Sequence, residues 1–140
     1  MQMTDATVLD MVTVAKALGD LTRARIVGLL GVRPLCVCEV KAALSLSQAT
    51  VSDHLRVLVG AGLVTASRRS YWTLYSLRED LPPEALRFIA LLADQVHEQY
   101  PGDQSRLACT PVFACAISPV HAPNERSRAR QRPRRSDAQP

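Results

Sequence analysis

The sequence predicts a mainly α-helical domain that contains one small β-hairpin, and three observations support this fold class. Apolar residues recur every three or four positions in four stretches before residue 60, which is typical of amphipathic helices. Between residues 63 and 77 the pattern changes to alternation and becomes rich in Val, Thr, Trp and Tyr, as expected of strands. After Pro82 and Pro83 the helical spacing returns.

The length and composition suit one globular domain. The chain has 140 residues, of which 47% are hydrophobic and 21% are charged. No run of about 18 apolar residues is present, so no transmembrane helix is predicted. The first basic residue is Lys16, which does not fit a secretory signal. We therefore expect a cytoplasmic protein without a membrane partner, in which thiols stay reduced.

The positive charge lies in the C-terminal segment. Residues 121–140 hold six Arg against two acids, whereas residues 1–120 hold equal numbers of basic and acidic side chains. The high pI alone therefore does not argue that the folded part binds nucleic acid. We predict one domain over residues 1–101 and a Cys-containing, Arg/Pro-rich tail over residues 102–140, disordered after about residue 118. The tail could be merely solvated, or it could add non-specific affinity for nucleic acid.

Caps and stops define the first four helices. The spacing predicts them at residues 5–18, 21–30, 37–44 and 48–59. Asp20 and Ser47 precede the second and fourth helices and can serve as their N-caps. The stretch Gly60-Ala61-Gly62 ends the fourth helix, because glycine readily adopts the positive φ that a turn needs.

The remaining elements complete a winged helix-turn-helix arrangement. Strands are predicted at residues 63–68 and 71–77, with a short turn near Arg69-Ser70, so that they form a hairpin. A long helix over residues 84–100 follows Pro82-Pro83 and ends at Pro101-Gly102. In this arrangement the third and fourth helices form the DNA-reading pair and the hairpin is the wing.

The fourth helix and the wing carry the candidate DNA contacts. Val51, Leu55 and Leu58 define the buried side of the helix, and hydrogen-bonding residues lie opposite and beside them. The candidate contacts to bases and phosphates are Ser47, Gln48, Thr50, Ser52, Asp53, His54, Arg56, Arg68 and Arg69. The alternatives are a solvated helix face, a hairpin tip charged only because it is wet, and internal packing of His54.

Two of the four cysteines, Cys36 and Cys38, stand at the start of the third helix in the stretch "PLCVCEV". They could be apolar filler or a disulfide. They could also bind a thiophilic ion, because sulfur ligands select soft ions and a helix N-terminus favours the thiolate. Cys109 and Cys115 are candidate further ligands, or thiols unrelated to that site.

The spacing of Cys36 and Cys38 suggests a mechanism. Residues i and i+2 of a regular helix point about 200° apart, so both sulfurs can hold one ion only if the first turn is distorted. That helix supports the fourth helix. Ion binding would therefore disturb the geometry of DNA recognition.

Four stretches in order resemble the ArsR/SmtB family of metal-responsive repressors: "LGDLTRARIVGLL", "LCVCEV", "SQATVSDHLRVLVGAGLV" and "YWTLYSL". The thiol stretch resembles the arsenic-responsive branch. The resemblance implies a homodimer through residues 5–18 and 84–100 that binds a twofold-symmetric operator. It also implies that no cofactor is required, and that As(III) or Sb(III), held by Cys36 and Cys38, acts as the inducer and releases the DNA.

The sequence departs from that family at three positions. Lys41 stands where arsenic-responsive members often have a third cysteine, and Asp53 stands where a neutral or basic residue usually precedes the recognition-helix His. Ser70 lies near an expected wing glycine. These departures leave the third metal ligand and the operator sequence open.

Other functions remain to be weighed. Cadmium or lead needs four ligands, and relatives that bind them add N-terminal cysteines. Residues 1–35 lack cysteine, which argues against these ions unless Cys109 and Cys115 substitute. Thiol oxidation is a further alternative signal. An enzyme of thiol chemistry, such as an arsenate reductase, would need an anion-binding loop around its cysteine; no Gly- or Arg-rich loop surrounds any cysteine here. We therefore predict no enzymatic activity.

Overall fold

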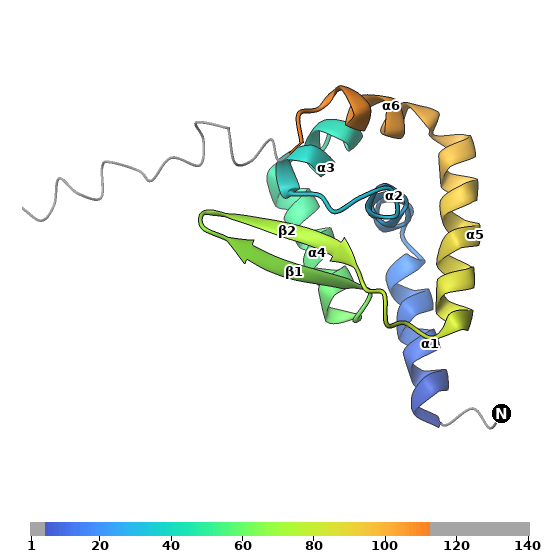
Figure 1. Ribbon diagram of the computed structural model, residues 1–140. Coiled ribbons are helices and arrows are strands. Elements are labelled where there is room, and N and C mark those ends of the chain that lie inside the picture. Colours follow the sequence, from blue (N-terminus) through green and yellow to red (C-terminus); the bar gives the residue numbers. More distant parts are fainter. Residues whose placement is uncertain (1–4, 113–140) are drawn as a thin grey trace, which may run out of the picture.

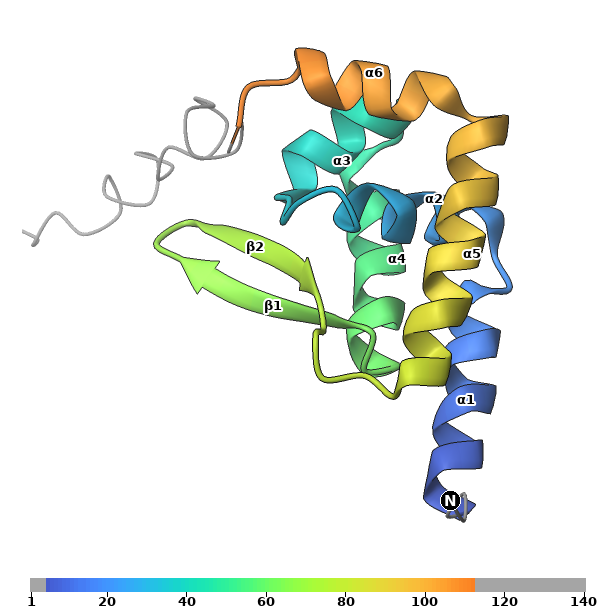
Figure 2. The same cartoon turned by 45° about the vertical axis from the view of Figure 1, so that its right-hand side comes forward.

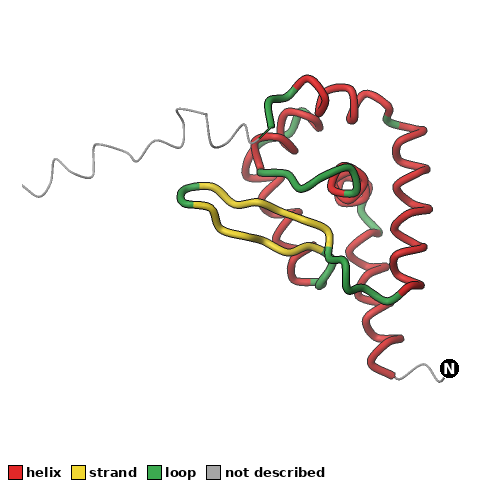
Figure 3. Tube along the Cα trace, in the orientation of Figure 1, coloured by secondary structure: helices red, strands yellow, loops and turns green. Residues whose placement is uncertain are grey.

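The computed structural model describes residues 5–112, with side chains from residue 11 onward. The element order is α1 (Asp5–Leu18), α2 (Leu21–Leu30), α3 (Val37–Leu44), α4 (Gln48–Gly60), β1 (Val64–Arg69), β2 (Trp72–Leu77), α5 (Pro83–Gln99) and α6 (Pro101–Cys109). The predicted class, mainly helical with one hairpin, is confirmed (Figure 3). The helix boundaries predicted before α6 agree within about one residue, because each is set by a local cap or stop.

The caps act as the sequence indicates. The Asp20 carboxylate accepts a hydrogen bond from the backbone N–H of Arg23 at 3.0 Å, which starts α2. The hydroxyl of Ser47 accepts from the backbone N–H of Thr50 at 3.2 Å, which starts α4. These bonds satisfy backbone donors that the first turn of a helix leaves without an intrahelical partner.

The core lies where α2, α3 and α4 meet the base of the hairpin. Its fully buried aliphatic side chains include Ile26, Leu29, Leu35, Val40, Val51, Leu55, Leu58 and Leu63. Helices α2 and α5 pack together along one side, and α4 lies beside the base of the hairpin (Figures 1 and 2). Helix α4 is thus held by its apolar stripe, which leaves its polar side exposed.

The hairpin is antiparallel, with Val64 opposite Leu77 and Arg69 opposite Trp72. Two residues, Ser70 and Tyr71, therefore form its turn. The turn lies one residue later than predicted near Arg69-Ser70, and the strands begin and end within one residue of the predicted positions. The hairpin projects away from the helices as a wing (Figure 1).

The sixth helix was not predicted. We expected the long helix to end at Pro101-Gly102 with no further helix after it, but only Tyr100 separates α5 from α6. Proline is tolerated in the first turn of a helix, where its missing N–H is not needed, so Pro101 begins α6 instead of ending helical structure. Helix α6 packs on α2, α3 and α5 (Figure 2).

Among the described residues, no helix combines the length and the apolar character needed to cross a bilayer.

Candidate functional site

Cys36 and Cys38 lie at the start of α3, but in different backbone environments. Cys36 is the N-cap residue, with extended backbone angles φ −93° and ψ 167°, and Cys38 is in the first helical turn. We expected the opposition of i and i+2 within regular helical winding to separate their sulfurs. Because Cys36 precedes the helix, that angle does not describe the pair.

Burial separates the two thiols instead. Cys36 has 0% of its surface exposed, whereas Cys38 is half-buried. Cys36, Cys38 and the exposed Cys109 are thiols, without a disulfide among the described residues. An ion from solvent therefore has access to Cys38, whereas Cys36 is enclosed in this structure.

A capping box holds Cys36 in place. The backbone N–H of Cys36 donates to Glu39 Oε1 at 3.0 Å, and the Cys36 side chain faces the backbone N–H of Glu39. Reciprocal bonds of this type satisfy two backbone donors at the helix start. The sulfur therefore has a structural role at the first turn of α3.

Glu39 is a fully buried carboxylate next to these thiols. Its Oε2 forms an ion pair with Arg33, which lies in the loop before α3. That oxygen lacks a well-directed hydrogen bond, so its stabilisation depends on the charge of Arg33. A buried carboxylate without its cation is costly, and the pair therefore ties the loop to α3. Sequence analysis missed both residues; the signal was the acid three positions after the N-cap.

The thiol segment is also attached to the wing. The backbone N–H of Leu35 donates to the Tyr75 carbonyl at 2.9 Å, and the N–H of Tyr75 donates to the Leu35 carbonyl at 2.8 Å. Leu35 therefore pairs with β2 on the edge away from β1. A displacement of Cys36 would act directly on this bridge.

Cys109 ends α6 and is exposed, while Cys115 lies outside the described residues. The residues on either side of Cys109 line a cavity of about 510 Å³ together with the loop before α3; its lining includes Val32, Arg33, Leu107, Ala108, Thr110 and Val112. Within residues 11–112, no group of three or more His, Cys, Asp or Glu side chains is arranged to hold a metal ion. Whether Cys109 or Cys115 supplies a ligand stays a prediction.

The polar side of α4 presents most of the predicted DNA contacts to solvent. Ser47, Gln48, Thr50, Asp53 and Arg56 are exposed, and Ser52 is half-buried. The Ser47 hydroxyl donates to Thr50 Oγ1 at 2.8 Å, so Ser47 is engaged as a cap.

Four polar side chains on α4 and α2 form two separate pairs. Arg56 pairs with Asp53 at 3.1 Å, an exposed pair of small energetic weight. His54 is half-buried, and its Nδ1 lies 3.5 Å from Arg23 Nη1. His54 thus has an internal partner, as one alternative supposed, and its contact with DNA stays a prediction.

The wing tip carries Arg68, Arg69 and Tyr71, all exposed. Ser70, between the strands, has φ +53°. This is the left-handed region that favours glycine, and it coincides with the position where the resemblance led us to expect a glycine. The wing turn therefore adopts this conformation with serine, which is less favourable than glycine at positive φ.

Comparison with known proteins places these features in a family. Residues 20–66 match the model of the "Bacterial regulatory protein, arsR family". The chain is 38% identical over 96 residues to the "Arsenic resistance transcriptional regulator ArsR1" of Pseudomonas putida, which covers 68% of this chain and 75% of that protein. It is 39% identical over 75 residues to the "Arsenical resistance operon repressor" of Escherichia coli, with coverages of 53% and 64%.

Solved structures agree with the fold. The antimony-specific transcriptional repressor AntR has a TM-score of 0.57 at 25% identity, covering 72% of this chain and 89% of its own. HlyU from Vibrio cholerae has a TM-score of 0.56 at 29% identity, with coverages of 69% and 98%. A winged helix-turn-helix domain from Mycobacterium bovis, described as homodimeric, has a TM-score of 0.54 at 26% identity, with coverages of 71% and 91%.

Proposed function

Because the chain belongs to the arsR family of bacterial regulatory proteins, we propose that it is an operator-binding repressor released by As(III) or Sb(III) bound at Cys36 and Cys38. Members of the family are DNA-binding transcription regulators, so the chain is a regulator and not an enzyme. The observation that carries the choice of inducer is the Cys-x-Cys pair at the start of α3, the helix that supports the recognition helix.

DNA binding uses α4 and the wing. The exposed side of α4 enters the major groove, where Gln48, Thr50 and Arg56 can reach base edges or phosphates. Arg68 and Arg69 at the wing tip contact the adjacent phosphates. Asp53 can accept from the amino group of a base, whereas a phosphate would repel its carboxylate.

The protein acts as a homodimer through α1 and α5. One side of α5 is buried against α2, yet Leu86, Phe88 and Leu91 on α5 and Val12 on α1 are exposed. An apolar surface of this kind on a helix argues for a protein partner. A second copy of the chain fits, because a twofold dimer presents two recognition helices to a twofold-symmetric operator.

The two sulfurs suit a soft trivalent ion. Thiolates select soft ions over Mg²⁺ or Ca²⁺. Two thiolates hold As(III) or Sb(III) with water or hydroxide as the third ligand, unless Cys109 or Cys115 replaces it. Lys41 is exposed on α3 and offers no sulfur at the position where related repressors often carry one.

Ion binding breaks the capping box. In the proposed mechanism, Cys36 moves out of its buried position as it joins Cys38 on the ion, and its backbone N–H then leaves Glu39 Oε1. The start of α3 loosens as a result. This replaces the helical-winding conflict expected from the sequence with a loss of specific capping contacts.

The disturbance reaches the DNA-binding surface by two routes. Helix α3 packs on α4, and Leu35, directly before Cys36, is hydrogen-bonded to Tyr75 in the wing. A coupling free energy of about 1–3 kcal/mol between ion and DNA would weaken DNA binding ~5–150-fold. Small changes in the packing of α3 on α4 and in the hydrogen bonds between Leu35 and Tyr75 are therefore enough to release DNA.

The decisive experiment measures DNA release. An operator fragment is first selected from random DNA with the full chain, and its binding is followed by fluorescence anisotropy during titration with arsenite or antimonite. The wild type should release the DNA, whereas the Cys36→Ser/Cys38→Ser variant, in which serine can take over the N-cap, should still bind the DNA and stay bound. The matched control is Cys109→Ser, a thiol change outside the capping box.

The outcomes separate the alternatives. Release of the double variant by arsenite would exclude Cys36 and Cys38 as the site. Loss of release in Cys109→Ser would make that thiol a ligand. If Cd²⁺, Pb²⁺ or hydrogen peroxide releases the DNA from the wild type at lower concentration than arsenite does, then that agent, and not As(III), is the signal.

A further inference from the structure

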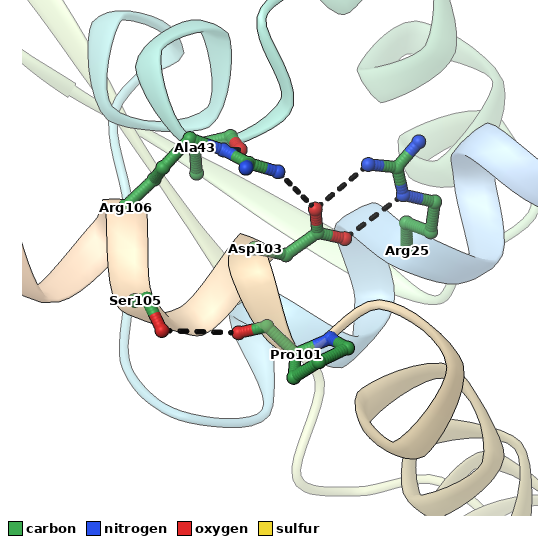
Figure 4. Close-up of polar contacts among 6 residues, drawn as sticks. All are labelled: Arg25, Ala43, Pro101, Asp103, Ser105 and Arg106. Atoms are coloured by element: carbon green, nitrogen blue, oxygen red, sulfur yellow. Dashed lines mark hydrogen bonds and ion pairs between the residues drawn. The ribbon is translucent and has the colours of Figure 1, made fainter.

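A second buried carboxylate, Asp103 of α6, lies between Arg25 and Arg106 (Figure 4). Arg25 of α2 donates from Nε to Asp103 Oδ2 at 2.8 Å and from Nη2 to Oδ1 at 2.7 Å. Arg106 of α6 donates from Nη2 to the same Oδ1 at 2.8 Å. One carboxylate therefore accepts three charge-assisted hydrogen bonds, a strong and directional arrangement.

The two arginines extend this network to other elements. Arg106 Nε donates to the backbone carbonyl of Ala43 at 2.6 Å, in the last turn of α3, where carbonyls lack intrahelical partners. The guanidinium of Arg25 lies over the ring of Tyr100, 4.5 Å from its centre. Tyr100 joins α5 to α6. The network, hereafter the Asp103 clamp, is made of Arg25, Tyr100, Asp103 and Arg106.

The elements joined by the clamp have different tasks in the proposed dimer. Helix α5 faces the second subunit, whereas α3 leads through Ser45-Leu46 into the recognition helix. The two recognition helices of a dimer must lie about 34–36 Å apart to enter successive major grooves. Their separation depends on the angle between α3–α4 and α5 within each subunit, and the clamp fixes the end of α3 relative to the end of α5.

We propose that Asp103 is a positioning residue for operator recognition, because its clamp orients α3 and α4 relative to the dimer helix α5 and so sets the half-site spacing that the dimer reads. This inference rests on the proposed function. A buried ion pair often adds little net stability, because removing its charges from water is costly. Its directional hydrogen bonds suit it instead to fixing the relative positions of the helices that it joins. The capping box lies at the opposite end of α3, so the clamp does not include Cys36 or Cys38.

The test uses the full-length Asp103→Asn variant. The amide keeps the size of the side chain, but its nitrogen is a donor that cannot accept from Arg25 or Arg106. Binding is measured to the selected operator and to versions with the half-sites moved by one or two base pairs in each direction. The variant should remain dimeric by sedimentation, bind the selected operator about 10-fold more weakly, and discriminate less between spacings.

Asp80→Asn is the matched control. Asp80 forms a similar two-bond pair with Arg78, at 2.9 and 2.7 Å, but this pair is on the surface. Its loss should change neither the affinity nor the spacing preference.

Two results would overturn the inference. One is a dimeric Asp103→Asn variant with the wild-type spacing preference. If this variant does not fold, Arg106→Gln is tested instead. Arg106 is exposed enough to tolerate the change, and the substitution removes the charge that bridges Asp103 and Ala43. The second result is an unchanged spacing preference in Arg106→Gln. Failure of the wild type to bind DNA at all would instead contradict the proposed function.

Discussion

Two serines adopt backbone angles that suit glycine better. Ser45, which follows α3, has φ +54°, and Ser70 in the wing turn has φ +53°. Residues with a Cβ lose about 1–2 kcal/mol in this region. The turn between the two DNA-reading helices and the turn of the wing are thus both formed at a local cost.

We predict that Ser70→Gly stabilises the wing. The substitution removes the Cβ penalty and should raise the free energy of unfolding by up to about 1 kcal/mol, partly offset by the greater freedom of glycine in the unfolded chain. Thermal denaturation followed by circular dichroism measures the change. Ser70→Val is the control, and it should destabilise, since a β-branched residue fits positive φ poorly. Equal stability of the two variants would contradict the strain at this turn.

Asp20 makes the stability of α2 sensitive to acid. The hydrogen bond from the backbone N–H of Arg23 lowers the pKa of Asp20 below 3.8, aided by the charge of Arg23 and opposed by partial desolvation. A depressed pKa in the folded state means that the ionised cap stabilises the fold above about pH 3.8, and that this stabilisation is lost as the pH falls through the folded-state value.

Asp20→Ala should therefore lower the free energy of unfolding by about 0.5–2 kcal/mol at pH 7. Asp20→Asn keeps an acceptor for the Arg23 N–H without a titrating charge. The advantage of the wild type over Asp20→Asn should shrink between pH 5 and pH 3 in urea denaturation. A constant difference across that range would show that the cap does not titrate with the fold.

Helix α3 connects the thiols to the DNA-binding surface at the level of elements. Its start is held by the capping box and by the pairing of Leu35 with the wing, and its end is held by Arg106. A short helix of eight residues has little intrinsic stability, so these contacts at its two ends determine where it lies. It is therefore a suitable element for an ion to displace.

We predict that Glu39→Gln makes the protein more sensitive to inducer. The amide oxygen can still accept from the Cys36 N–H, but the ion pair with Arg33 is lost, and the capping box opens at a lower cost. The arsenite concentration that half-releases the operator should fall roughly 3–10-fold, equivalent to about 1 kcal/mol. Anisotropy titration measures it, with the exposed Glu79→Gln as control. An unchanged or higher midpoint would remove the capping box from the mechanism.

In the proposed function, one side of the whole molecule contacts DNA and another side contacts the second subunit. The exposed polar face of α4 and the wing tip belong to the first, and the exposed apolar residues of α1 and α5 belong to the second. Helix α2 packs on both α4 and α5, and α6 packs on both α3 and α5, so these two helices join the two sides. Dimer formation and operator binding are therefore mechanically linked, although separate residues perform them.

Leu91→Asp should separate the subunits. Leu91 is 63% exposed on α5, so an acid there does not disturb the core of one subunit but places a charge in the proposed dimer contact. The variant should sediment as a monomer and bind the operator at least ~100-fold more weakly, because one subunit reaches only one half-site. Val32→Asp, an exposed apolar position outside α1 and α5, is the control. A dimeric Leu91→Asp protein would place the contact elsewhere.

The sequence by itself determined the elements from α1 to α5 and the hairpin, because each depends on residues close in the chain. Asp20 and Ser47 cap helices three residues away, and the alternation after Leu63 defines strands that a two-residue turn brings together. Cys36 and Cys38 were recognisable as a candidate site for the same reason, since their spacing and the following helix are local features.

The tertiary structure decided which of these residues are buried and what they contact. Arg25 contacts Asp103 across 78 positions of sequence, and Arg106 contacts Ala43 across 63. The spacing of apolar residues does not predict which distant residues form such pairs. Pro101 read locally as a stop, but the packing of α6 on α2, α3 and α5 makes a helix there favourable. The burial of Cys36 likewise follows from the surrounding core, because the enclosure of a side chain depends on every element that packs around it.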